Sequence, residues 1–215
     1  MSQENRFIYR VKYTKGELVK YISHLDFLRC VNRSFKRGKI PVKYSNGFNP
    51  HVLLNIALPC PVGVSSICEL LDIELYEEMA PEEIKKRLSA SLPVGMEVLE
   101  VERNQNLKDF FDITTALYHT TFKSDKEIDI EKFIAEPEFI IEKKSKRGMK
   151  EVNVKDFVKK LELKDSCGTS YSISMVIDAG NKSNLKPELL LGAMEKYFDA
   201  VFTDIKTERK EIYFD

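Results

Sequence analysis

The order of strand-like and helix-like segments in the first half of the chain restricts the fold more than any other feature. Alternating apolar and polar residues predict strands, and apolar residues three and four apart predict helices. In order, these patterns predict a strand at 7–12, a helix at 23–37, strands at 52–58 and 68–76, a helix at 81–92 and a strand at 96–101, with a short extra strand near Val42. This is the split βαβ order of ferredoxin-like domains, in which an antiparallel sheet carries both helices on one face.

The second half repeats this theme less regularly. The patterns predict strands at 113–122, 139–143, 169–178 and 204–214, and helices at 130–135, 154–163 and 188–198. Residues 149–153 are an alternative return strand of a hairpin that turns at 146–148. Since 215 residues exceed the common domain size of about 100 to 150, we place a boundary in the polar stretch 104–106. The predicted fold class is α+β, with two ferredoxin-like lobes with antiparallel sheets at 1–104 and 105–215.

Charge is distributed unevenly along the chain, although the formal net charge is zero. Between residues 10 and 43 only Glu17 and Asp26 are acidic. The cations of this segment are Arg10, Lys12, Lys15, Lys20, Arg29, Arg33, Lys36, Arg37, Lys39 and Lys43. Residues 69–83, in contrast, are almost wholly acidic in their charge. Segregation of this kind creates a local positive surface, and the local potential decides which partners dock.

The helix predicted at 23–37 has one apolar face and one cationic face. Ser23 followed by Asp26 is typical of a helix start, because the hydroxyl accepts from a free backbone N–H and the carboxylate favours the positive end of the helix dipole. The packing face carries Leu28, Val31 and Phe35. The opposite face carries Arg29, Arg33, Lys36 and Arg37. This stripe is either a solvated surface or an anion-binding one. Because like charges weaken a helix slightly, we favour an anionic partner.

Two of the three histidines, His24 and His51, lie near this helix in the sequence. In one interpretation His24 is a hydrogen-bonded residue beside the helix cap, and His51 closes the turn that follows Pro50. In the other, both imidazoles meet at one pole of the sheet and act as general acid and base near neutral pH. The second interpretation predicts a catalytic site made of His24 and His51.

A polar turn after the helix carries an aromatic side chain, Phe48, between Gly47 and Asn49. The ring either packs beneath the turn, which is the more common arrangement, or stacks on a nucleobase. For RNA binding we include Lys43, Phe48 and Asn49 in the predicted interface. A second basic tip, on a hairpin in the other lobe, contains Lys144, Lys146, Arg147 and Lys150. This tip is either a solubilising loop or a second nucleic-acid contact.

Cysteine spacing and hydropathy bound the class of protein. Cys30, Cys60, Cys68 and Cys167 include no pair at the two-residue spacing that zinc and iron–sulfur sites use, so we expect no metal site in this chain. The sequence begins without a secretory signal and has no apolar run of membrane-spanning length. We therefore expect reduced thiols in a cytoplasmic protein that does not enter a membrane.

Several short blocks of the first lobe occur in the order and at the spacing of a known family. The blocks are 21–26 (YISHLD), Arg29 with Arg33, Pro41 with Val42, Tyr44 with Ser45, 47–50 (GFNP), Leu58 with Pro59, and 62–64 (VGV). Their motif positions include Ser23, Asp26, Tyr44, Ser45, Gly47, Pro50 and Gly63. These blocks resemble the signature of the radical SAM-linked proteins, a domain family of undetermined function encoded beside or fused to a cobalamin-binding radical SAM protein. The resemblance implies an RNA- or ribosome-related task, such as RNA modification.

A weaker likeness is to the RAMP-type CRISPR endoribonucleases, which pair ferredoxin-like domains and bind RNA on basic surfaces. Their glycine-rich C-terminal loop is missing here, because residues 179–181 contain a single glycine. This difference argues against RNA cleavage of that type.

The combined expectation is an RNA-binding accessory subunit that presents an RNA, such as tRNA or rRNA, or a ribosome-related substrate to a radical SAM partner. This chain lacks the three-cysteine radical SAM motif. The resemblance therefore implies that the iron–sulfur cluster, SAM and cobalamin belong to the partner. Two alternatives stay open. One is a metal-independent endoribonuclease that uses His24 and His51. The other is a protein-interaction module that holds a partner through the acidic segment 69–83, without nucleic acid.

Overall fold

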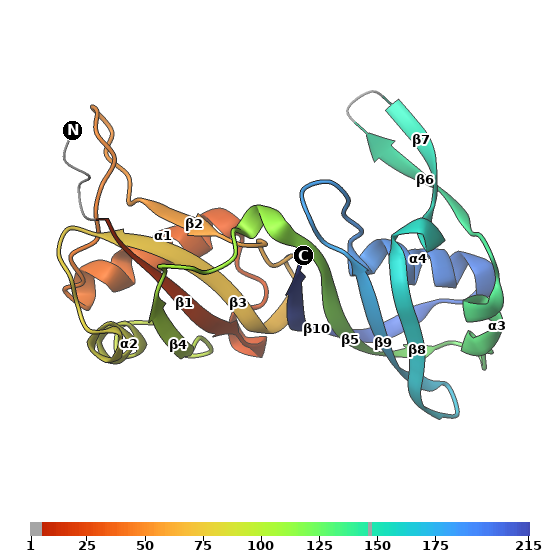
Figure 1. The fold of residues 1–215 in the computed structure, drawn as a ribbon. Helices are drawn as coiled ribbons and strands as arrows, with labels where there is room; N and C mark the ends of the chain where they lie inside the picture. Colours follow the sequence, from red (N-terminus) through yellow and green to blue (C-terminus); the bar gives the residue numbers. More distant parts are fainter. Residues whose placement is uncertain (1–5, 146–147) are drawn as a thin grey trace. The chain divides into compact units, whose positions relative to one another are not determined.

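The structure is a computed structural model that describes residues 6–145 and 148–215. Contacts between residues divide the chain into two compact units, Met1–Phe110 and Phe111–Asp215. Both units combine a small antiparallel sheet with a few helices (Figure 1), so the predicted α+β class is confirmed.

Unit 1 has the predicted ferredoxin-like order. Its elements are β1 (Phe7–Lys15), the short 3₁₀ helix η1 (Glu17–Val19), α1 (His24–Arg37), β2 (Leu54–Ile56), β3 (Val64–Leu75), α2 (Pro81–Ser89) and β4 (Val98–Arg103). The strands lie in the order β4-β1-β3-β2. Each neighbouring pair is antiparallel. The short strand predicted near Val42 is reduced to two isolated bridges, which pair Val42 with Leu75 and Tyr44 with Val52.

The core of unit 1 lies between the sheet and its two helices. Tyr9, Val11 and Tyr13 of β1 point into it, as their exposed fractions of 1%, 0% and 3% show. Tyr13 stacks on Phe27 of α1 with ring centroids 5.5 Å apart. The other buried apolar residues of the two helices are Val31, Phe35, Ile84 and Leu88. Burial of these aromatic and aliphatic side chains fixes the helices on one face of the sheet, because the removal of apolar surface from water drives packing.

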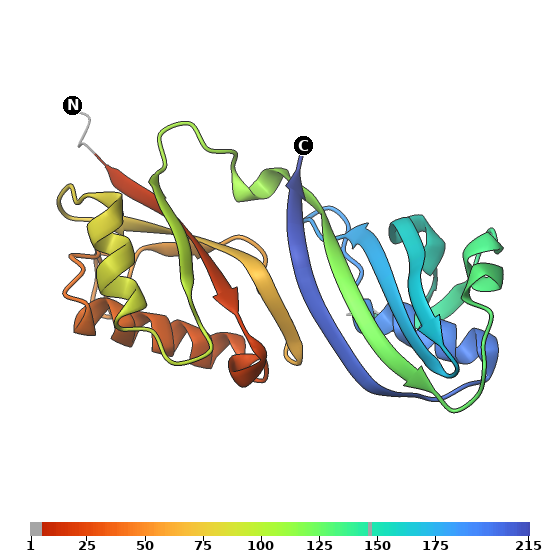
Figure 2. The same cartoon turned by 90° about the horizontal axis from the view of Figure 1, so that it is seen from below.

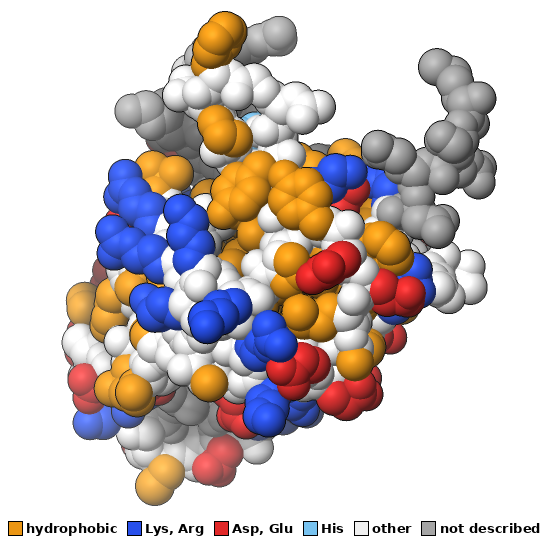
Figure 3. All heavy atoms as spheres, turned by 90° about the vertical axis from the view of Figure 1, so that its left-hand side faces the viewer, with side chains coloured by type: hydrophobic (Ala, Val, Ile, Leu, Met, Phe, Trp, Pro, Cys, Tyr) orange, Lys and Arg blue, Asp and Glu red, His pale blue; other side chains and the backbone are white. Residues whose placement is uncertain are grey.

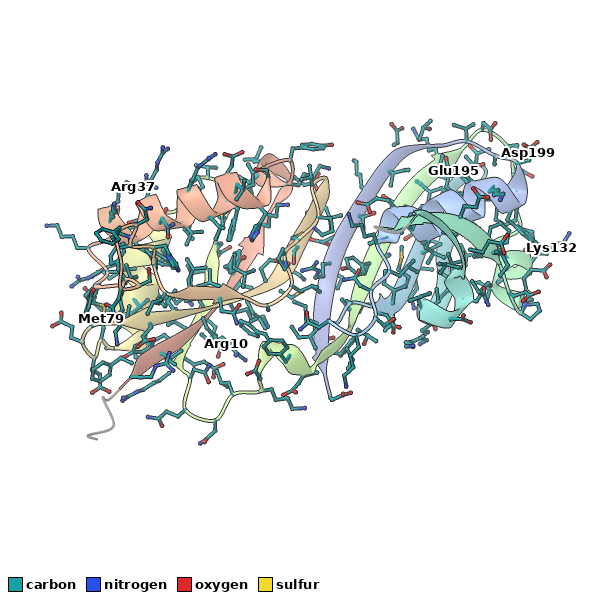
Figure 4. All side chains as sticks on the ribbon, turned by 90° about the horizontal axis from the view of Figure 1, so that it is seen from above. Arg10, Arg37, Met79, Lys132, Glu195 and Asp199 are labelled. Carbon is teal, nitrogen blue, oxygen red and sulfur yellow. The ribbon has the colours of Figure 1, made fainter. Side chains whose placement is uncertain are left out.

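The other face of this sheet is covered by the segment that leaves β4. Arg10 forms two hydrogen bonds of 2.8 Å to the carboxylate of Asp72, and a third, of 2.9 Å, to the carbonyl oxygen of Lys108. Its guanidinium lies 4.2 Å from the ring centroid of Phe110, and Asn104 also donates to Asp72. Figure 4 shows Arg10 on one side of the unit 1 sheet, and Arg37 of α1 on the other side. These contacts place the division after Phe110, whereas the sequence predicted it after residue 104.

Unit 2 has the same topology with a hairpin inserted. Its elements are η2 (Phe110–Asp112), β5 (Ile113–Ser124), α3 (Ile130–Ala135), β6 (Ile140–Ser145), β7 (Gly148–Asn153), η3 (Val154–Phe157), β8 (Val158–Cys167), β9 (Ser170–Asp178), α4 (Pro187–Phe198) and β10 (Phe202–Phe214). Its strands lie in the order β10-β5-β9-β8, again antiparallel throughout. Without β6 and β7, the order of elements and of strands matches that of unit 1.

The helix predicted at 154–163 is wrong, because the chain there is the 3₁₀ turn η3 followed by the edge strand β8. The register of β8 against β9 shifts between Val158 and Lys160, and again between Leu163 and Asp165. Each such bulge adds a residue and interrupts the period of two that marks a strand. The remaining apolar spacing therefore resembled a helix. The alternative return strand at 149–153 is confirmed as β7, which pairs with β6.

Both units place an excursion at the same point of the fold, between their first helix and their second strand. In unit 1 it comprises residues 38–53, and in unit 2 it contains the β6–β7 hairpin. Figure 1 shows both excursions projecting from their units. The predicted Lys146 and Arg147 lie outside the described residues. For Lys144 and Lys150 of the same tip the structure describes the backbone only.

Candidate nucleic-acid interface

The start of α1 is built as the sequence predicts. The Ser23 hydroxyl accepts a 3.2 Å hydrogen bond from the backbone N–H of Asp26 and donates one of 2.8 Å to the Asp26 carboxylate. Asp26 also binds Arg29 at 2.9 Å. The hydrogen bond from Ser23 and then that from Arg29 lower the pKa of the Asp26 carboxyl. The first cation of the predicted stripe is therefore paired within its own helix.

The C-terminal ends of α1 and α2 meet and bring together a group of cations, with α2 standing across the end of α1 (Figure 2). Arg37 donates to the carbonyl oxygen of Ser91 at 2.5 Å, and Arg87 donates to that of Lys39 at 3.1 Å. A Cβ atom at Gly38 would lie only 3.0 Å from the carbonyl oxygen of Arg87, so glycine permits this approach. The residues that we call the α1–α2 cation cluster are Arg33, Lys36, Arg37, Lys39, Lys86 and Arg87.

Few acids neutralise this cluster. Arg87 pairs with Glu83 at 2.6 Å. Within the described part of the chain, Arg33, Lys36 and Lys39 have no carboxylate at ion-pair distance, and all three are exposed. Figure 3 shows Lys and Arg side chains gathered on this face of the molecule. Cations at helix C-termini also stabilise the helix dipoles, which accounts for part of the cluster. Lys39 lies beyond the helix, however, and adds to a field that attracts anions.

A loop with an exposed aromatic tip rises from the same excursion. This segment, which we call the Phe48 loop, runs from Tyr44 to Val52, whose backbones form a bridge. The backbone N–H of Ser45 donates to the carbonyl oxygen of His51 at 2.8 Å, and the Ser45 hydroxyl bonds both the backbone N–H and Nδ1 of His51, at 3.1 and 2.8 Å. Phe48 is 106% exposed. The expectation that its ring packs beneath the turn is therefore wrong, whereas His51 closes the turn as predicted.

At the base of the Phe48 loop two cations share one carboxylate. Lys43 binds Glu74 at 3.0 Å, and Arg6 binds the other oxygen of the same carboxylate at 2.7 Å. The hydrogen bond from Arg6 is the largest cause that lowers the pKa of Glu74; burial opposes it, and the hydrogen bond from Lys43 adds to the lowering. Lys43 therefore contributes less free charge to the interface than its sequence position suggested. Beside it, Tyr76 is 61% exposed and accepts a hydrogen bond from the backbone N–H of Tyr44.

His24 and His51 are not brought together. His24 lines a cavity of about 20 Å³, room for about one water molecule, that Tyr13 at the end of β1 also lines. His51 belongs to the Phe48 loop, which lies near the other end of β1. The chain enters this loop after Val42, which bridges to Leu75, and Leu75 pairs with Phe7 at the start of β1. Residues 7 and 13 are separated by about 20 Å along a strand. The predicted acid–base pair therefore does not form at one pole of the sheet.

The acidic segment 69–83 does not form one exposed acidic surface. Glu69 and Glu74 are 2% and 5% exposed, and Asp72 is bound by Arg10. Asp72 and Glu74 lie two residues apart and share one face of β3, where Arg10 and Arg6 bind their carboxylates. The exposed acids of this segment are Glu77, Glu78 and Glu82.

A separate exposed surface surrounds η1 and the start of α1, and it is apolar. Gly63, at φ +86°, allows the chain to pass Tyr21, and Gly95, at φ +96°, lies against Leu18. The residues that we call the Tyr21 patch are Leu18, Tyr21, Leu25, Val62 and Val94, with exposed fractions of 77%, 72%, 63%, 55% and 83%. Exposed apolar residues gathered in this way mark surfaces that bind other molecules.

A scan against protein families matches residues 8–187 to a family described as "Uncharacterized protein conserved in bacteria (DUF2344)". The chain belongs to the DUF2344 family. The match includes the α1–α2 cation cluster, the Phe48 loop and the Tyr21 patch, and it extends through both units to the start of α4. A search of curated proteins finds no match to this DUF2344 chain. No helix in residues 6–145 and 148–215 is long and apolar enough to cross a membrane.

Sequence reasoning missed some polar and aromatic residues of this DUF2344 protein. Lys86 and Arg87 join the cluster only because the end of α2 meets that of α1, which the sequence does not specify. Tyr76 follows the last buried residue of β3, and its position just past a strand end was the available signal. In unit 2, His119 of β5 hydrogen-bonds Ser172 of β9 at 2.9 Å. Strand alternation predicts that these two side chains share a face, but not that they pair.

Proposed function

We propose that this DUF2344 protein is an RNA-binding accessory subunit that holds a folded RNA, such as tRNA or rRNA, for a radical SAM partner. The observation that carries the RNA part is the group of exposed cations without carboxylate partners, Arg33, Lys36 and Lys39, beside a loop that exposes Phe48. Neutralisation of phosphates by Lys and Arg releases counterions and supplies most of the affinity for nucleic acids. Exposed aromatic rings add stacking on bases.

The partner part of the proposal rests on the likeness of the first unit's motifs to the radical SAM-linked proteins. The Tyr21 patch supports it, because its exposed apolar side chains suit a protein surface better than a phosphate backbone. The charges beside it pair with each other, Glu17 with Lys20 and Asp26 with Arg29. In this proposal the iron–sulfur cluster, SAM and cobalamin are held by the partner. The chain itself binds and positions the substrate.

Two other functions receive less support. A metal-independent endoribonuclease needs an acid and a base that exchange protons at one phosphate, and His24 and His51 lie at opposite ends of β1. A protein-interaction module without nucleic acid gains support from the Tyr21 patch, but it does not explain the exposed cations without carboxylate partners, such as Lys39 beyond the end of α1. The same patch is compatible with a subunit that binds both RNA and a protein.

Ultraviolet cross-linking of the full-length protein to the RNA that co-purifies with it tests the proposal. Mass spectrometry of the digested complex should find nucleotides attached to peptides from 33–51, which contain the end of α1 and the Phe48 loop. Sequencing of the recovered RNA identifies the substrate. If no RNA co-purifies, or if cross-links form only on peptides elsewhere in the chain, the proposed function is wrong.

A further inference from the structure

We infer that the Phe48 loop captures an unpaired nucleobase, so that the target is an RNA with a single-stranded nucleotide next to a helical region. This inference rests on the proposed RNA binding and names the class of RNA. It begins from Phe48, whose ring contacts nothing in the described structure and stands at the tip of a projecting loop. A fully exposed phenyl ring has no stabilising role in the free protein, since it buries no surface.

The neck of the loop that carries this ring is already ordered in the free protein. The backbone bridge between Tyr44 and Val52 closes its neck, and the three hydrogen bonds between Ser45 and His51 close the next level. A further bond of 2.8 Å runs from the N–H of Leu53 to the carbonyl oxygen of Lys43. A neck that is already ordered lowers the entropy that binding has to remove, which is the advantage of preorganisation.

The residues beside Phe48 are better suited to contact an RNA nucleobase than to enter a pocket of another protein. Gly47 has φ +122°, and a Cβ atom added to it would meet no heavy atom within 4 Å, so the backbone just before Phe48 is open, and the Phe48 ring itself is fully exposed. Asn49 is exposed and offers an amide donor and acceptor at the same tip. Stacking with a phenyl ring and hydrogen bonding to a base edge are the two contacts that proteins use on unpaired RNA bases.

Base pairing within the RNA limits what this loop can reach. The major groove of an A-form helix is deep and narrow, and its bases are stacked on each other, so a phenyl ring can stack only on a base that has left the helix. The phosphates of the RNA remain available to the cation cluster whether the strand is paired or unpaired. From Lys39 in the cation cluster to Tyr44 at the loop neck the chain spans at most about 18 Å. The cluster and the loop that carries Phe48 can therefore contact the same RNA strand, on the face in Figure 3 that shows cations beside the projecting loop.

The test compares two labelled RNAs of the same helical sequence, a blunt duplex and a duplex with an unpaired 3′ extension that contains 2-aminopurine. Anisotropy titrations use the full-length protein with Phe48→Ala, with Phe48→Trp, and with Phe111→Ala as a matched control, because Phe111 is 75% exposed in the other unit. We expect wild type to prefer the extended RNA by about tenfold, from one base stacked on an aromatic ring. Phe48→Ala should abolish the preference, and Phe48→Trp and Phe111→Ala should keep it.

The outcomes separate this inference from the proposed function. Loss of the preference, together with loss of 2-aminopurine quenching in Phe48→Ala, supports base capture. If Phe48→Ala binds the extended RNA as tightly as wild type does, the inference is wrong. In that case, weaker binding of both RNAs by variants of the cation cluster would still support the proposed function. If wild type binds neither RNA, the proposed function fails as well. If Phe48→Ala releases a co-purifying protein and leaves RNA affinity unchanged, the loop is a protein anchor and the inference is overturned.

Discussion

Replacing Arg33 and Lys36 by Gln and Lys39 by Asn should make RNA binding markedly less sensitive to salt. The three side chains are exposed and have no carboxylate at ion-pair distance in the described structure, so their charges are available to phosphates. Asn is chosen at position 39 because Lys39 has φ +51°, in the left-handed region that Asn tolerates. None of the three side chains forms a described hydrogen bond, so the melting temperature should stay near that of wild type.

The magnitude follows from counterion release. Each neutralised phosphate contributes about 0.7 to 0.9 to the slope of log affinity against log salt, so three lost contacts should lower the slope by about 2 to 3. Between 50 and 200 mM salt, wild type should then lose about 15 to 40 times more affinity than the triple variant does. The assay is a series of anisotropy titrations with one folded RNA across this salt range, using the full-length protein.

A matched control removes the same charge elsewhere. Lys126, Lys132 and Lys182 are exposed on unit 2, and their replacement by Gln changes the net charge by the same amount. Figure 4 labels Lys132 among the side chains of unit 2. The control should keep the wild-type slope. If both triple variants lower the slope of log affinity against log salt equally, the overall charge of the protein attracts the RNA, and the cluster is not a specific RNA-binding site. An unchanged slope in the cluster variant would remove it from the interface.

Three further expectations concern stability and chemistry. Glu74 has a pKa below its ordinary 4.5, chiefly through Arg6, so the stability that it adds is complete above about pH 4.5 and is lost as pH falls through the lower folded pKa. Urea unfolding should show that Glu74→Gln removes this part of the acid dependence; an unchanged dependence would contradict the pairing. Arg10→Ala should lower the free energy of unfolding by about 3 kcal/mol, because it leaves Asp72 without its buried partner, and a loss below about 1 kcal/mol would contradict that role. Purified protein in EDTA should not cleave its RNA. Discrete cleavage that disappears in folded alanine variants of either histidine of unit 1 would establish the nuclease instead.

Local patterns allowed much of unit 1 to be predicted from the sequence. Ser23 and Asp26 mark the start of α1, and Gly38 follows its last residue, because capping depends on neighbours in the chain. The strand order followed from element order, since few topologies bury both helices on one face. The pair Asp26–Arg29 was not predicted, although residues three apart meet on a helix and their spacing was the available signal.

The features that sequence did not reveal depend on register and on contacts distant in the chain. Lys43 meets Glu74 only because the chain after α1 lies beside β3, and no local pattern encodes that pairing. The bulges of β8 hid a strand, since its alternation is broken between Val158 and Lys160 and between Leu163 and Asp165. Arg10 and Phe110 extend unit 1 past the polar stretch that looked like a linker, because their stacking joins residues from opposite ends of the unit.

The shared position of the two excursions gives this architecture freedom to change its ligand without changing its scaffold. Both lie between the first helix and the second strand, and the strand beside that junction is held by other strands of its sheet, β2 by β3 and β8 by β9. Doubling the length of a flexible loop costs only about 0.6 kcal/mol in closure entropy. The exposed residues 46–50 in unit 1 and the β6–β7 hairpin in unit 2 can therefore change in length, while Ile40, Val42 and Val52 stay in the core of unit 1. A chain with this fold can thus acquire a new specificity from one crossover.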